Sequence, residues 1–288
     1  MSSTAAPPSS SKPAKNTNKP AAIPAPAKRE LKILMLHGYT QSGPLFKNKT
    51  GALNKLLNKA LSPPPYNYTV SLVYPTGPHN LRPADIPGYQ PPEDGGAVDD
   101  GAPSDNWGWF RHDAATGTYR GFAEGMHRVA EAIRDAGGVD GVLGFSQGGA
   151  QAALVAAALE SDRRPLPAAL AGDEGSWARA LRAANGGRAL RFCVVYSGFV
   201  ARDEALQWLN EGGMATPSLH FLGGWTRSRG LVEACGAEGD GPGGRARVLV
   251  HPGGHYVPVS KEWTMPVVGF LREVLAEEPA EDRARETL

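Results

Sequence analysis

Short apolar runs alternate with stretches of helical spacing along most of the chain. The apolar runs, each ending at or just before a glycine, proline or serine, are LKILMLHG, TVSLVYP, VDGVLGF, LRFCVVYSG, PSLHFLG and RARVLVHPG. Runs of this length between turn residues are typical of buried strands. Helical spacing covers residues 48–61, 119–136 and 262–277, and GGAQAALVAAALE also fits a helix. The alternation predicts an α/β domain, with a mostly parallel sheet flanked by helices on both faces.

The two ends of the chain and one internal segment do not follow this pattern. Residues 1–29 are rich in Pro, Ala, Ser and Lys, with too few large apolar side chains to offset the entropy of ordering, so we expect a disordered tail. Residues 278–288 are charged and expected to fray, which leaves 30–277 as a single folded domain. Residues 79–106 are rich in Pro, Gly and Asp, and long loops of this kind often act as lids or binding loops.

Composition and charge argue against several classes of binding partner. The net charge of the 288-residue chain is only +1, which argues against nucleic acid or an anionic membrane surface as a partner. No apolar stretch approaches the roughly 20 residues of a membrane span. The two cysteines, Cys193 and Cys235, form no disulfide framework, so we expect a reducing compartment: the cytoplasm, with the nucleus as a second location. The seven histidines lack metal-ligand spacing, and we expect neither a metal nor a cofactor.

The segment GVLGFSQGGA places Ser146 at G-x-S-x-G spacing, between a predicted strand and a predicted helix. Ligand sites in parallel sheets form at the carboxyl ends of strands. Glycines on both sides allow a sharp turn that exposes a serine hydroxyl above the sheet, where the helix N-terminus favours a developing negative charge. The sequence therefore predicts Ser146 as a nucleophile. The alternative is an ordinary helix N-cap serine in a glycine-rich turn.

A serine nucleophile needs a base and an oxyanion hole. His255 lies in HPGGHYVP, after the last predicted strand, and we expect it to be the general base. His251 competes for that role, but it lies on the strand itself and is expected to be buried. The loop after the first strand and the residue after the nucleophile supply oxyanion donors in this architecture, which predicts the backbone N–H groups of Tyr39 and Gln147. We expect His37, just before that loop, to have a structural role.

Several segments, in this order and spacing, resemble the fungal family of serine hydrolases with an α/β-hydrolase fold. The matching segments are LHGYTQSGPLFKNKTGAL, YPTGPHNLRPADIPG, WGWFRHD, YRGFAEGMHRVAEAI, GVLGFSQGGA, VVYSGF and HPGGHYVP. The resemblance extends from about Leu31 to about Leu275. It implies the α/β-hydrolase fold, Ser146 as nucleophile and His255 as base.

The chain departs from that family at the third member of the triad. Family members usually carry an aspartate in a G-x-x-D turn after the strand that matches PSLHFLG. Here the strand leads into GGWTRSRGLVEACG, a shortened turn around Trp225 in which Thr226 stands nearest the expected acid. Asp203, after the preceding strand, is a weak substitute. The shortened turn is either a real divergence or an error in the gene model.

These features predict hydrolysis of a small-molecule ester or thioester through an acyl-enzyme. Trp107, Trp109 and Phe110 either line an apolar acyl pocket or belong to the core. One alternative is a catalytically weakened small-molecule binder that keeps the pocket without a complete triad. A protein-interaction scaffold is a weaker alternative, because the chain has neither a repeat nor a charge stripe. The acyl group and the oligomeric state cannot be predicted from the sequence.

Overall fold

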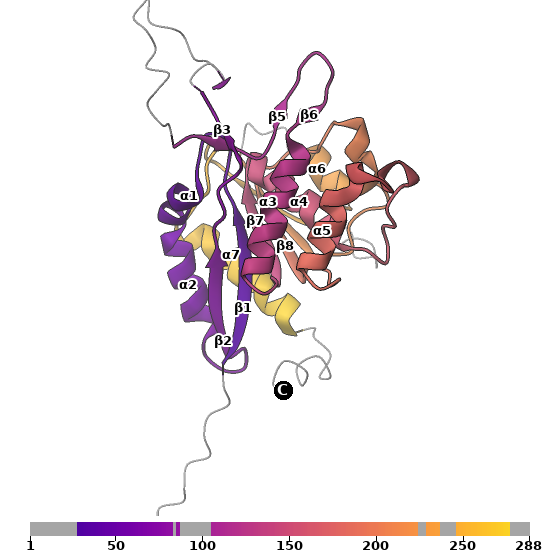
Figure 1. Cartoon of the computed structure of the whole chain (residues 1–288). Coiled ribbons are helices and arrows are strands. Elements are labelled where there is room, and N and C mark those ends of the chain that lie inside the picture. The colour runs from indigo at the N-terminus through magenta and orange to yellow at the C-terminus, as the bar shows by residue number, and fades with distance from the viewer. Residues whose placement is uncertain (1–27, 83–84, 87–104, 224–228, 237–245, 277–288) are drawn as a thin grey trace, which may run out of the picture.

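A six-stranded parallel sheet organises the chain (Figure 1). The computed structural model describes residues 28–82, 85–86, 105–223, 229–236 and 246–276. The strand order is β10-β9-β8-β7-β1-β2, and every neighbouring pair is parallel. The strands of this sheet are β1 (Arg29–Leu36), β2 (Tyr68–Val73), β7 (Gly141–Phe145), β8 (Phe192–Tyr196), β9 (Ser218–Gly223) and β10 (Ala246–His251).

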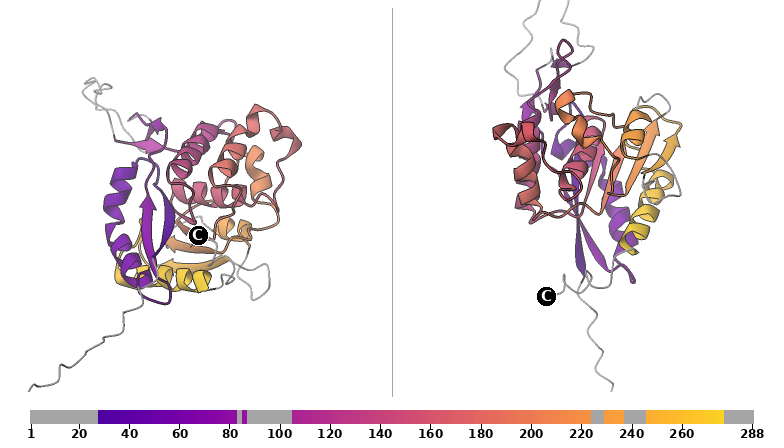
Figure 2. Two further views of the ribbon diagram at one scale, coloured as in Figure 1. Left: turned by 60° about the horizontal axis from the view of Figure 1, so that its bottom comes forward. Right: turned by 90° about the vertical axis from the view of Figure 1, so that its right-hand side faces the viewer.

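Helices cover both faces of the sheet (Figure 2). They are α1 (Gly43–Lys49), α2 (Gly51–Leu61), α3 (Phe122–Asp135), α4 (Gln147–Leu159), α5 (Ser176–Ala184), α6 (Arg229–Ala234) and α7 (Lys261–Ala276). Side chains alternate between the two faces along each strand. On β8, Phe192 and Val194 join the core under α2 and α7, whereas Cys193 and Val195 join the core under α3, α4 and α5. The predicted α/β-hydrolase architecture, a parallel sheet between two helical layers, is confirmed.

Two short antiparallel pairs lie above the carboxyl edge of the sheet. β3 (His79–Asn80) pairs with β4 (Trp107–Gly108), and β5 (Arg111–His112) pairs with β6 (Tyr119–Arg120). The predicted loop 79–106 therefore begins in a strand, although residues 83–84 and 87–104 lie outside the described residues. These pairs border the site described below.

The helices differ from the sequence prediction in three places. The predicted helix 48–61 is two helices that meet at Thr50, whose hydroxyl donates to the carbonyl of Phe46 and contacts the hydroxyl of Tyr74. The predicted helix over residues 119–136 begins only at Phe122, because Tyr119 pairs with His112 in β5. Helix α5 was not predicted, since its apolar face consists of only a few residues in an Ala- and Arg-rich stretch.

The domain limits are close to the predicted ones. Strand β1 begins at Arg29, one residue before the predicted start of the domain. Residues 1–27 and 277–288, which contain nearly all of the two predicted tails, lie outside the described residues.

Candidate active site

A strained turn presents Ser146 at the carboxyl end of β7. Its backbone angles are φ 54° and ψ −116°, a conformation that side-chain-bearing residues rarely adopt. Its N–H donates to the carbonyl of Tyr196 at 2.9 Å, which fixes the turn to the end of β8. Backbone strain of this kind costs about 1–3 kcal/mol and persists only where the surroundings enforce it.

The two glycines of the motif allow strand and helix to meet around this turn. A Cβ on Gly144 would collide with the carbonyl oxygen of Gly148, and a Cβ on Gly148 would collide with the carbonyls of Leu36 and His37. A third glycine, Gly38, would meet the ring of Phe145 at 2.8 Å. The G-x-S-x-G spacing is therefore a steric requirement of the elbow.

His255 meets Ser146 across the edge of the sheet. Its Nε2 lies 2.8 Å from the Ser146 Oγ, and its ring packs on Phe145 with centroids 5.0 Å apart. Desolvation lowers the pKa of His255 below its ordinary value of 6.5. At neutral pH the imidazole is therefore uncharged, and Nε2 can accept the hydroxyl proton. The structure thus brings together the predicted nucleophile and base.

The predicted oxyanion donors lie in the two segments next to the dyad. Among the described residues, the backbone N–H groups of Tyr39 and Gln147 have no hydrogen-bond acceptor. The Gln147 side chain accepts from the backbone N–H of Trp109 at 2.8 Å and donates to the carbonyl of Phe110 at 2.8 Å. This amide bridge fixes the first residue of α4 to the segment after β4. The role of the Gln147 side chain was missed from the sequence, because the motif refers only to its backbone.

His37 holds the loop that carries Tyr39. Its Nε2 accepts from the backbone N–H of Gly77 at 2.9 Å, so the ring proton is on Nδ1, which donates to the carbonyl of Gly38 at 2.8 Å. Its own carbonyl accepts from the indole N–H of Trp109 at 2.9 Å. Burial lowers the pKa of His37 to about 4. The ring is therefore neutral and has the structural role expected of it.

Asp203 does not supply the missing acid. One carboxylate oxygen accepts from the backbone N–H of Tyr119 at 2.7 Å, and the other accepts from that of Ala205 at 3.0 Å, where Asp203 caps the short 3-10 helix Glu204–Leu209. No carboxylate among the described residues hydrogen-bonds to His255. Trp225 and Thr226, in the shortened turn, lie outside the described residues.

The remaining candidates are structural. His251 is buried against the rings of Tyr256 and Trp263, so it is not placed to act as the base. Trp109 and Phe110 are fully buried, so these two rings belong to the core and do not line an acyl pocket. Trp107 is half-buried in β4.

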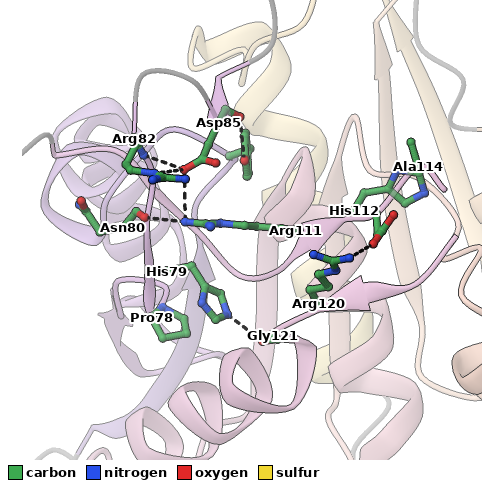
Figure 3. Close-up of a pocket in the computed structure, with 12 residues that line it drawn as sticks. Pro78, His79, Asn80, Arg82, Asp85, Arg111, His112, Ala114, Arg120 and Gly121 are labelled. Atoms are coloured by element: carbon green, nitrogen blue, oxygen red, sulfur yellow. Dashed lines mark hydrogen bonds and ion pairs between the residues drawn. The ribbon is translucent and has the colours of Figure 1, made fainter. Parts of the chain in front are cut away.

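Two cavities border residues of the site, one at His255 and one at Tyr39. The smaller one, about 300 Å³, lies against His255 and has mostly apolar walls. Its lining residues are Gln41, Phe46, Lys49, Phe145, His255, Tyr256, Val257 and Val259. The larger one, about 850 Å³, lies beyond the side chain of Tyr39 and has mostly polar walls (Figure 3). The second cavity could not be predicted from the sequence, because its walls come from three separate segments of the chain.

Comparison with known proteins agrees with this geometry. A family model described as "Serine hydrolase (FSH1)" matches residues 27–267. The chain belongs to this serine hydrolase family. The match covers both the elbow and His255, and the resemblance predicted from the sequence motifs is confirmed.

Relatives of this serine hydrolase include proteins named as esterases. Esterase OVCA2 of Danio rerio is 31% identical over 258 residues, covering 84% of this chain and 96% of that protein. Family of serine hydrolases 3 of Saccharomyces cerevisiae is 26% identical over 273 residues, covering 88% of each. A Schizosaccharomyces pombe protein named dihydrofolate reductase is 28% identical over 262 residues, which are 87% of this chain, and the chain spans only 49% of that protein.

Neither a metal site nor a membrane-spanning helix is found among the described residues. Within them, no group of three or more His, Cys, Asp or Glu side chains is placed to hold a metal ion. None of their helices is both long and apolar enough to cross a membrane.

Proposed function

We propose that this serine hydrolase cleaves a small-molecule ester or thioester through an acyl-enzyme on Ser146. The observation that carries the proposal is the 2.8 Å contact between the Ser146 Oγ and the His255 Nε2 on a strained elbow. The esterase names of the relatives support the same class of reaction.

The reaction begins when Ser146 Oγ attacks the carbonyl carbon and its proton passes to His255 Nε2. The carbonyl oxygen becomes an oxyanion, which accepts hydrogen bonds from the backbone N–H groups of Tyr39 and Gln147. Collapse of this intermediate expels the alcohol or thiol, which takes the proton from His255. Water then attacks the acyl-enzyme by the same route, releasing the acid and regenerating the serine.

A second function, a weakened small-molecule binder, is favoured by one observation. Both carboxylate oxygens of Asp203 accept backbone N–H bonds elsewhere, so this acid does not orient His255. In the serine-protease template, loss of the acid's carboxylate lowers turnover by about 10⁴. A residual rate from serine, base and oxyanion hole is still expected, because these parts act without the acid.

Turnover of 4-nitrophenyl butyrate and of a butyryl thioester separates the two functions. We expect turnover that is abolished in Ser146→Ala and in His255→Gln. Ser197→Ala is the matched control, because Ser197 also has a positive φ, 49°, at the end of β8, and its hydroxyl has no partner among the described residues. Wild-type turnover no faster than that of folded Ser146→Ala would favour the binder.

A further inference from the structure

Charged side chains line the large cavity beyond Tyr39. Three guanidinium groups, from Arg82, Arg111 and Arg120, face it together with two carboxylates, from Asp85 and Asp113. Among the described residues that line the cavity, the guanidinium groups therefore outnumber the carboxylates by one. His79 and His112 add two imidazoles to the same wall. Figure 3 shows the Arg111 side chain lying between the segment that carries Asp85 and strand β6, which carries Arg120.

The carboxylates hold the arginines in place. Asp85 accepts from the backbone N–H of Arg82 at 2.9 Å and pairs with the side chains of Arg82, at 3.6 Å, and Arg111, at 3.3 Å. Asp113 accepts from the N–H of Ala115 at 2.9 Å and pairs with Arg120. These backbone bonds lower the pKa of both acids, which therefore stay ionised and keep the guanidinium groups oriented.

Arg111 is the cation best placed to bind a ligand. Its Nη2 donates to the carbonyl of Asn80 at 2.9 Å and contacts Asp85, so one edge of the guanidinium is fixed. Its Nη1 has no acceptor among the described residues. The side chain is 40% exposed and lines the cavity. A guanidinium that is already immobilised loses little further entropy when it binds a carboxylate or phosphate oxygen.

Tyr39 connects this cavity to the reacting atoms. Its backbone N–H is one of the proposed oxyanion donors, while its side chain is part of the cavity wall, with the hydroxyl donating to the carbonyl of Asp85 at 3.1 Å. A carbonyl held by the Tyr39 backbone N–H would therefore lie at one end of this residue, with the charged cavity at the other end, around its side chain. The apolar cavity against His255 lies close to the same carbonyl.

We propose that the cavity beyond Tyr39 binds an anionic group of the substrate, and that the substrate is an ester or thioester with one apolar arm and one arm carrying a carboxylate or phosphate. The inference rests on the proposed function, because it takes the carbonyl to be bound at Ser146. The cavity volume of about 850 Å³ accommodates a multi-atom arm rather than a single small ion.

Matched substrates test the inference. In one pair the charge is on the acyl arm: mono-4-nitrophenyl succinate against 4-nitrophenyl butyrate. In the other it is on the alcohol arm: 4-carboxyphenyl and 4-phosphonooxyphenyl butyrate against phenyl butyrate. We expect the wild type to prefer the anionic member of at least one pair by about tenfold or more in kcat/KM. Arg111→Gln should reduce that ratio about tenfold, and Arg111→Lys should restore part of it.

Arg134→Gln is the matched control. Arg134 is an exposed arginine in the last turn of α3, the helix whose N-cap residue, Gly121, lines the cavity. This variant should keep the wild-type ratio. No preference for any anionic member, or a ratio that Arg111→Gln leaves unchanged, would overturn the inference.

Binding to Ser146→Ala gives a readout that does not need turnover. By calorimetry we expect this variant to bind the preferred anionic ester about tenfold more tightly than its neutral partner, and Arg111→Gln to remove the difference. Equal affinities would contradict the inference. A wild type that turns over neutral esters without charge preference refutes only the anion site, whereas a folded wild type with no turnover refutes the proposed function.

Discussion

The His37 imidazole accepts the backbone N–H of Gly77 through Nε2, at 2.9 Å, and this bond exists only while the ring is neutral. The bond ties the start of the loop that carries Tyr39 to the turn after β2. Protonation would place a second N–H against that donor and a charge in a buried site, which is why burial lowers the pKa of His37 to about 4. The position of Tyr39 therefore depends on the protonation state of a residue that takes no part in the reaction.

Stability should fall as the pH falls below about 6.5. The unfolded state takes up a proton at His37 near pH 6.5 and the folded state near pH 4, so folding is destabilised through this window, by about 2 kcal/mol between pH 7 and pH 5. His220, buried beside Ser218 with its pKa also lowered to about 4, should contribute similarly. Urea unfolding at both pH values measures the loss. His37→Phe should remove the His37 part, and an undiminished pH dependence in that variant would contradict this assignment.

Gly148→Ala should destabilise the protein by about 1–3 kcal/mol or prevent folding, because its Cβ would collide with backbone carbonyls of β1 and its following loop. Gly269→Ala is the matched control within a helix. An added Cβ at Gly269 meets nothing within 4 Å, and the variant should gain about 0.5–1 kcal/mol. Thermal unfolding of the two variants gives the comparison. Equal stabilities would show that the elbow tolerates a side chain.

Gln147→Met should lower kcat about tenfold or more. It keeps the backbone donor but removes the amide bridge to Trp109 and Phe110. Gln151→Met serves as the control, since Gln151 lies one turn later in α4, equally buried, and bonds only the sulfur of Met126 among the described residues. Steady-state kinetics on 4-nitrophenyl butyrate should give a fall in kcat with little change in KM. A change confined to KM would mean that the bridge acts on binding instead.

The pH dependence of kcat/KM should have its acidic limb below pH 6.5. The proposed reaction needs neutral His255, whose pKa is lowered by desolvation. Activity should therefore persist as the pH drops through 6.5 and disappear at lower pH, when the imidazole is protonated. A rate profile from pH 4.5 to 8 measures this, recorded under conditions in which the protein stays folded throughout each measurement. A limb above pH 7 would indicate that a carboxylate stabilises the imidazolium.

Asp203→Asn should affect stability rather than catalysis. The asparagine has one acceptor oxygen where the aspartate has two, so one of the backbone N–H groups of Tyr119 and Ala205 loses its partner. Loss of such a capping bond lowers the free energy of unfolding by about 0.5–2 kcal/mol. We expect kcat within about threefold of wild type, since a surface or capping change leaves the dyad intact. A fall of 10³ or more in kcat, with the fold intact, would restore Asp203 as the triad acid.

The sheet and the dyad could be predicted from the sequence because their signals are local. Each of the six strands is an apolar run ending at a turn. Ser146 follows β7 directly, and His255 lies in the turn after β10. The bridge from Gln147 to Trp109 could not be predicted, because it joins residues 38 positions apart through a buried amide. The cavity around Arg111 could not be predicted either. Its walls come from separate segments of the chain, and the sequence does not indicate how these segments are placed relative to one another.

The most direct test of the account is labelling with a fluorophosphonate, followed by mass spectrometry of the intact protein and of its peptides. The account predicts a single adduct on the peptide that contains Ser146, absent from Ser146→Ala and slowed in His255→Gln, while Ser197→Ala labels at the wild-type rate. A folded wild-type protein that takes up no label, or an adduct on a residue other than Ser146, would contradict it.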